Sequence, residues 1–281
     1  MDMSLKQGFI ERWSKYFPGA ELPVVFYYAD DPGPVKTAAV PRGHRCFIGD
    51  LAAVRRGKPL AFKAEAVTCG GGKRYLGFTQ ELRPQFEHFL SCGIPGKLEG
   101  ERYKKSPELV TEQLKHQRPF EAPGRYLVFK RWDALEAGDE PLVAVFFAPP
   151  DVLSGLFTLA NFDEAGPDGV RAPFGAGCSS VVYYPFQELQ SGSPKAILGM
   201  FDVSARPWVG PDVLTFAVPW PQFVRMANNM DESFLITGSW NKVRTRIRHT
   251  PTPRMTRMTR MMNGRRGRAS ESGPDEGHAW K

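Results

Sequence analysis

The stretch Pro-Leu-Val-Ala-Val-Phe-Phe, residues 141–147, decides the fold, because it is a run of apolar, β-branched and aromatic residues. Residues of this kind favour the pleated surface of a buried strand. A similar run, Pro-Val-Val-Phe-Tyr-Tyr, occupies residues 23–28 in the first half of the chain. The two runs predict one buried strand in each half of a protein that mixes strands with helices.

The order of elements after these two strands recurs along the chain. Each strand is followed by a predicted helix, a second strand and a second helix. In the first half these segments are 45–57, 59–67 and 84–93, and in the second half they are 177–192, 195–203 and 221–230. The pattern predicts an α/β or α+β fold of two similar strand-helix-strand-helix halves, related by internal duplication and packed about a shared interface.

Two sequence anchors support the duplication. Cys46 and Cys178 are 132 residues apart, and the Pro-Gln-Phe tripeptides at 84–86 and 221–223 are 137 residues apart. Chance is the alternative, since a tripeptide is short and alternation of strands and helices is common. With duplication, residues 1–132 and 133–247 are the two halves, and residues 248–281 form a tail.

Further helices are predicted at 4–17, 106–117 and 149–162, with a strand at 125–132. Ser4 and Ser106 are placed to cap the first two helices, and Pro107 and Pro150 suit a first helical turn.

The net charge of +7 is concentrated at the end of the chain. From Asn241 onward there are eleven Lys or Arg and three Asp or Glu, a net +8, so residues 1–240 carry −1. The tail has almost no aliphatic residues, and this composition predicts disorder. No apolar run is long enough to span a bilayer, and no export signal is evident, so the sequence predicts a cytoplasmic protein without a membrane partner. Nucleic acid is expected as a partner only through the tail, by phosphate contacts.

The four cysteines contain no Cys-x-x-Cys pair, which argues against a zinc ribbon or a thioredoxin site. Cys46 and Cys178 each follow a polar, glycine-containing loop and open a predicted helix. A thiol at this end of a helix dipole is expected to have a lowered pKa, which favours the thiolate that attacks electrophiles or binds metal. The alternative interpretation is that these cysteines are small residues required for the tight packing of helices and loops.

The glycine-rich stretch after Cys69 does not match a nucleotide-binding loop, because Val67 and Arg74 stand where that motif needs Gly and Ser or Thr. Its successive glycines and the following Lys73 still predict either a nest for an anion or a flexible turn. Arg206 is predicted either to clamp a carboxylate or phosphate, or to pair with Asp202 inside its own loop.

Several ordered landmarks resemble the domain of unknown function 169 family, which comprises uncharacterised proteins of archaea and of anaerobic or metabolically diverse bacteria. The landmarks are Arg45-Cys46-Phe47, Cys69-Gly70-Gly71 with Leu76-Gly77, Gly-Glu-Arg-Tyr at 100–103, Phe-Gly-x-Gly-Cys at 174–178, Asp-x-Ser-Ala-Arg at 202–206, and Trp240. The resemblance covers residues 10–247. It implies no settled activity, but it supports treating the cysteine, glycine and arginine loops as one site.

The leading hypothesis is a protein that binds a small anionic ligand, or a metal or iron–sulfur cofactor, at a cysteine- and glycine-rich interface site. The ligand-binding candidates are Arg45, Gly70, Gly71, Gly72, Lys73, Asp202 and Arg206, and the metal-binding candidates are Cys46, Cys69 and Cys178, with Cys92 as a potential fourth ligand. One alternative is a thiol-dependent enzyme with Cys178 or Cys46 as nucleophile and His44 as base. The other is a module that binds nucleic acid through the basic tail.

Overall fold

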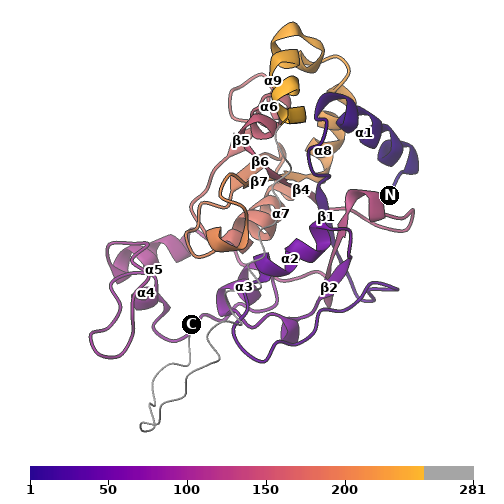
Figure 1. Cartoon of the computed structure of the whole chain (residues 1–281). Helices are drawn as coiled ribbons and strands as arrows, with labels where there is room; N and C mark the ends of the chain where they lie inside the picture. Colours follow the sequence, from indigo (N-terminus) through magenta and orange to yellow (C-terminus); the bar gives the residue numbers. More distant parts are fainter. Residues whose placement is uncertain (250–281) are drawn as a thin grey trace, which may run out of the picture.

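The computed structural model describes residues 1–249, which form a mixed α/β fold around one seven-stranded sheet (Figure 1). The strands lie in the order β2-β3-β1-β4-β7-β6-β5. Their bounds are β1 Val24–Ala29, β2 Leu60–Phe62, β3 Tyr126–Arg131, β4 Val143–Ala148, β5 Val170–Arg171, β6 Ala196–Gly199 and β7 Leu214–Pro219. Neighbouring strands are antiparallel, except for the parallel pair of β5 and β6.

The two apolar runs form strands, as predicted, and these strands lie at the centre of the sheet. Strands β1 and β4 pair with each other in antiparallel register, with Val25 opposite Ala144. Every residue of β4 is buried, because both faces of the sheet are covered. Ala144 and Phe146 belong to the core on one face, whereas Val143 and Val145 belong to the core on the other. Successive side chains of a strand point to opposite faces of the sheet. A continuous apolar run therefore suits a strand that is covered on both faces.

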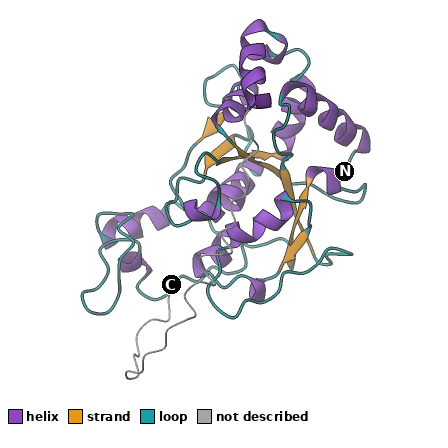
Figure 2. Ribbon diagram, in the orientation of Figure 1, coloured by secondary structure: helices purple, strands orange, loops and turns teal. Residues whose placement is uncertain are grey.

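Helices cover both faces of the sheet (Figure 2). One face packs against α1, α6, α8 and α9, whose bounds are Met3–Tyr16, Pro150–Ala160, Trp220–Asn229 and Gly238–His249. The other packs against α2, α3, α7 and a π-helical turn, η3, with the bounds Phe47–Arg55, Gly70–Tyr75, Tyr184–Leu189 and Ser179–Tyr183. Helices α4 (Phe86–Phe89) and α5 (Pro107–Lys115) form an arm beside the sheet (Figure 1).

The order of strands has the same pattern on both sides of the β1–β4 pair. In the first half β1 pairs with β3, which pairs with β2, and in the second half β4 pairs with β7, which pairs with β6. The Pro-Gln-Phe anchors do not fit this correspondence, because the first borders α4, before β3, and the second lies in α8, after β7. Internal duplication and the division into residues 1–132 and 133–247 therefore stay predictions.

Several predicted segments differ from the structure in length or type. The predicted strand 59–67 is a strand only over 60–62, and Ala64–Ala66 forms a 3-10 turn. The predicted helix 84–93 is helical only over 86–89. Asp2 rather than Ser4 caps α1, since its carboxylate accepts a hydrogen bond from the Ser4 backbone N–H at 2.8 Å.

Residues 250–281, which make up most of the predicted tail, lie outside the described residues, so its disorder and its nucleic-acid binding stay predictions. Within residues 1–249 no helix is both long and apolar enough to cross a membrane. A cytoplasmic location stays a prediction.

Helix α1 is held to the turn after α8 by Asp231. The Asp231 carboxylate accepts hydrogen bonds from the Tyr16 hydroxyl at 2.7 Å, Arg12 Nε at 2.8 Å and Lys15 Nζ at 3.0 Å. The hydrogen bond from Tyr16, then those from Lys15 and Arg12, lower the pKa of Asp231 to about 2. A single carboxylate thus connects the first helix to the second half of the sheet.

We expect Asp231→Asn to reduce the acid sensitivity of folding. Because the pKa of Asp231 is lowered in the folded protein, its contribution to stability is present above its ordinary pKa of 3.8 and is lost as the pH falls towards 2. Urea unfolding between pH 2 and 6 should show a smaller loss of stability in the variant over this acid range. Equal pH dependence in both proteins would contradict this role.

Gly155 allows α6 to pack closely against the last helix. A methyl group at Gly155 would lie 2.4 Å from the Trp240 ring and 2.7 Å from the Phe17 ring. We expect Gly155→Ala to lower the free energy of unfolding by about 1–3 kcal/mol through overpacking, although alanine is favoured over glycine in helices by about 1 kcal/mol. Gly166→Ala is the matched control, because no atom lies within 4 Å of a methyl group there. Equal unfolding free energies in urea for both variants would contradict this.

Candidate functional site

Three of the four cysteines precede helical segments on the same face of the sheet. Cys46 is the N-cap of α2, Cys69 is the N-cap of α3, and Cys178 comes directly before η3. All three are partly buried. We call Cys46, Cys69 and Cys178 the thiol cluster.

A hydrogen-bonded tie joins the segments that carry Cys46 and Cys69. The backbone N–H of Arg45 donates to the Thr68 hydroxyl oxygen at 3.0 Å, and that hydroxyl donates to the Gly43 carbonyl at 3.0 Å. Each bonded residue stands directly before a cysteine or close to it in sequence. The start of α2 is therefore held beside the start of α3.

Close packing joins Cys178 to the same place. A methyl group at Gly177 would lie 2.6 Å from the Ala205 side chain and 3.3 Å from that of Ile48, so only glycine allows this approach. The Gly177 backbone N–H donates to the buried Asp202 carboxylate at 3.0 Å. The start of α2, the loop 174–178 and the loop 200–208 thus form one packed unit.

Charge interactions also link the three cysteines. Burial is the main cause of the raised pKa values of both Cys46 and Cys178, and a charge on Cys69 or Asp202 raises them further. For Cys178, whose thiol pKa lies well above its usual range, the charge of Cys46 acts in the same direction. Although Cys178 is partly exposed as a residue, the dense protein around its sulfur controls the pKa.

The expectation of lowered thiol pKa values is wrong for Cys46 and Cys178. The nearby backbone N–H groups of Ile48 and Gly49 do act to lower the pKa of Cys46, as its place before a helix suggests, although neither makes a capping hydrogen bond to its side chain. The loss of hydration around the sulfur outweighs them. Both thiols are therefore protonated near neutral pH, the state in which a cysteine is a poor nucleophile.

The glycines after Cys69 form a helix rather than a loop. Gly70, Gly71 and Gly72 make the first turn of α3, and the Cys69 sulfur accepts a hydrogen bond from the Gly72 N–H at 3.4 Å. A methyl group at Gly72 would lie 3.1 Å from the Val67 side chain. Lys73 follows in the same helix. The glycine-rich loop on which the anion nest was predicted is therefore absent, because these residues are used for capping and packing.

The two predicted arginine ligands are engaged elsewhere in the protein. The Arg206 guanidinium donates to the backbone carbonyls of Val213, Gly210 and Pro211, and within residues 1–249 it forms no ion pair with the Asp202 carboxylate. Arg45 forms an ion pair with Asp50 on α2. Neither guanidinium is left to balance the charge of Asp202.

Cys92 and His44 stand apart from the thiol cluster. Cys92 is exposed between α4 and α5, where its thiol donates to the Gly93 carbonyl at 3.4 Å. His44 is exposed, and within the described residues it makes no hydrogen bond to a thiol. Among the described residues His44, the predicted base, is therefore not hydrogen-bonded to Cys46.

The arrangement of possible donor groups bears on the predicted metal site. Among residues 1–249, no group of three or more His, Cys, Asp or Glu side chains is placed to hold a metal ion. The thiol cluster brings its sulfurs into range of one another's charge without forming such a group. An iron–sulfur cluster or a tetrahedral zinc centre does not fit this arrangement.

Tyr103 is a site residue that the motifs did not single out as a ligand. Its ring meets Phe174 edge-on, with centroids 6.4 Å apart, and its hydroxyl lies near Ser204 and Asp202. The buried hydroxyl makes no well-formed hydrogen bond, and burial raises the pKa of Tyr103 to about 12. The only signal in the sequence is the Gly-Glu-Arg-Tyr landmark, because Tyr103 is 71 residues from Phe174 and 99 residues from Asp202.

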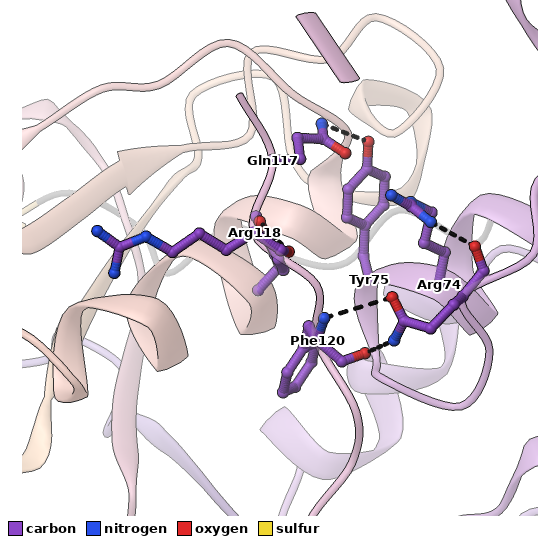
Figure 3. Close-up of a pocket in the computed structure, with 7 residues that line it drawn as sticks. Arg74, Tyr75, Gln117, Arg118 and Phe120 are labelled. Carbon is purple, nitrogen blue, oxygen red and sulfur yellow. Dashed lines mark hydrogen bonds between the residues drawn. The ribbon is translucent and has the colours of Figure 1, made fainter. Parts of the chain in front are cut away.

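A narrow cleft lies beside α3 (Figure 3). Its lining residues are Arg74, Tyr75, Gln80, Gln117, Arg118, Phe120 and Tyr183. Gln117 donates to the Tyr75 hydroxyl at 3.2 Å, and Arg74 donates to the Gln80 carbonyl at 2.5 Å. The Arg118 guanidinium points away from Arg74 in Figure 3. The free volume of about 10 Å³ admits about one water molecule rather than a ligand.

We expect Cys92 to be alkylated by iodoacetamide near neutral pH much faster than Cys46 or Cys178. Cys92 is exposed, whereas burial keeps the other two thiols protonated, so their rates should continue to rise with increasing pH. Mass spectrometry of peptides measures each site, and Cys92→Ser should remove only the fast phase. Faster reaction at Cys178 or Cys46 would contradict this and would favour a thiol-dependent enzyme.

Comparison with known proteins gives one family match. A family model for DUF169, a domain of unknown function described as uncharacterised ArCR, matches residues 20–229. No curated protein and no solved structure matches the chain significantly. The matched region holds the thiol cluster, Tyr103 and Asp202, and it leaves Trp240 outside. Because the match spans most of the sequence, this chain belongs to the DUF169 family.

Proposed function

We propose that the protein binds a soft monovalent metal ion, such as Cu⁺, through two sulfurs of the thiol cluster. The observation that carries the proposal is the convergence of Cys46, Cys69 and Cys178 from the starts of α2, α3 and η3. Cysteine sulfur is the protein donor that soft ions prefer. The described residues hold no group of three donors placed for a metal ion, but a two-coordinate ion needs only two.

The charges around the thiol cluster favour a cation over the small anion of the original hypothesis. Asp202 is the buried charged group beside Cys178. The nearest predicted counter-ions are engaged, Arg206 with backbone carbonyls and Arg45 with Asp50. The Asp202 carboxylate would therefore repel an anion, since neither guanidinium offsets its charge. The same carboxylate would attract a cation.

The surroundings of the sulfurs also suit a soft ion. Cys46 and Cys178 pack against the core that fills this face of the sheet, beside apolar residues such as Ile48, Met200 and Ala205. Low polarity excludes the water that would compete with sulfur for the ion. When bound, the ion would supply a positive charge that replaces the thiol protons.

Anaerobic titration with Cu⁺ against the competing chelator bicinchoninate tests this function. We expect the protein to hold one Cu⁺ per chain, and Cys178→Ser to weaken binding at least tenfold. Cys92→Ser is the matched control, because it also removes one thiol but lies outside the thiol cluster, and we expect its affinity to equal that of the unmodified protein.

Two results of this titration would contradict the proposal. One is unchanged Cu⁺ affinity in Cys178→Ser, Cys46→Ser and Cys69→Ser alike. The other is loss of binding in Cys92→Ser alone, since the ion would then sit on the exposed thiol. Circular dichroism of every variant before titration separates loss of the site from loss of the fold.

A further inference from the structure

A basic groove lies at the opposite end of the fold from the arm of α4 and α5. It runs between the end of α1 and the helix α9, and it has a volume of about 420 Å³. Its lining residues are Ser14, Lys15, Pro18, Arg244, Thr245 and Arg248. This volume falls within the roughly 300–1,000 Å³ typical of small-molecule sites. All six residues lie outside residues 20–229, so the groove is not part of the matched family region.

Trp240 of α9 joins the two walls of the groove, which are the end of α1 and α9 itself. The Trp240 indole N–H donates to the Tyr16 carbonyl at 3.0 Å, and the Trp240 ring packs edge-on against Phe17 at a centroid distance of 5.1 Å. Trp240 is buried, so these contacts are shielded from solvent. The groove is therefore built between two docked helices.

The lining of the groove is cationic and hydroxylated, and within the described part of the chain it includes no acidic side chain. Arg244 and Arg248 are four residues apart and share one side of α9. Within residues 1–249 neither of them forms a salt bridge, in contrast to Arg246, which binds Asp151 on α6. Lys15 shares Asp231 with Arg12, so that group of three side chains keeps one net positive charge.

We infer that this groove binds a small phosphate-bearing anion, with Arg244 and Arg248 as its principal contacts. A planar guanidinium binds two phosphate oxygens at once, and the hydroxyl groups of the lining add hydrogen-bonding capacity. Among residues 1–249 the lining holds no aromatic side chain that could stack on a nucleobase.

A small ligand fits these charges better than a nucleic-acid backbone does. A nucleic-acid site follows the backbone with a continuous basic surface. Here the neighbouring cations are neutralised, since Arg225 pairs with Asp163 and Glu164, and Arg246 pairs with Asp151. Arg244 and Arg248, which have no such partner within residues 1–249, place positive charge at the groove itself, and this favours a compact anion.

Isothermal titration of the full chain with pyrophosphate tests the inference. We expect the double variant Arg244→Gln/Arg248→Gln to bind at least tenfold more weakly than the unmodified protein. Arg246→Gln is the matched control: it removes one positive charge from the same helix, outside the groove lining. Its affinity should stay within about twofold, as expected for a residue that does not contact the ligand.

Three outcomes would overturn this inference. Absence of pyrophosphate binding in the unmodified protein is the first, and an equal loss in Arg246→Gln, which would indicate diffuse charge attraction, is the second. The third is binding of a single-stranded oligonucleotide, but not of pyrophosphate, with an affinity that the double variant leaves unchanged. That result would assign anion binding to the basic residues after α9.

Discussion

The antiparallel pairing of β1 with β4 is the constraint on which the rest of the structure depends. These two strands come from different halves of the chain, and β4 is buried along its whole length. Every other strand extends the sheet outward from this pair. Because both faces are apolar, both must be covered, and the helices of the two halves are thereby brought over the same sheet. The thiol cluster is a consequence, since α2 and α3 meet η3 on one of those faces.

The fold was predictable where one short segment contains the whole signal. The runs 141–147 and 23–28 identify the central strands, and Ser106 with Pro107 marks the start of α5. The glycines 70–72 were predicted as a loop or turn, because glycine is a poor helix former. In the structure Cys69 caps this turn and the missing side chain at Gly72 allows contact with Val67, so tertiary packing outweighs propensity.

The candidate site was predictable as a set of cysteines but not in its chemistry. The similar positions of Cys46 and Cys178 indicated that they belong together, and the structure brings both near Cys69. Their pKa values depend on how much protein surrounds each sulfur, which the sequence does not reveal. The bonds of Arg206 to its own loop and the contact of Tyr103 with the loops at 174–178 and 202–206 are likewise tertiary features.

We propose that two sulfurs of the thiol cluster hold one soft ion. A crystal structure of the protein loaded with one equivalent of Ag⁺, with the ion located by its anomalous scattering, would show where the ion lies. We expect a single ion between the Cys178 sulfur and that of Cys46 or Cys69. An ion bound at Cys92, or spread over surface positions while the three partly buried thiols stay free, would contradict the proposal.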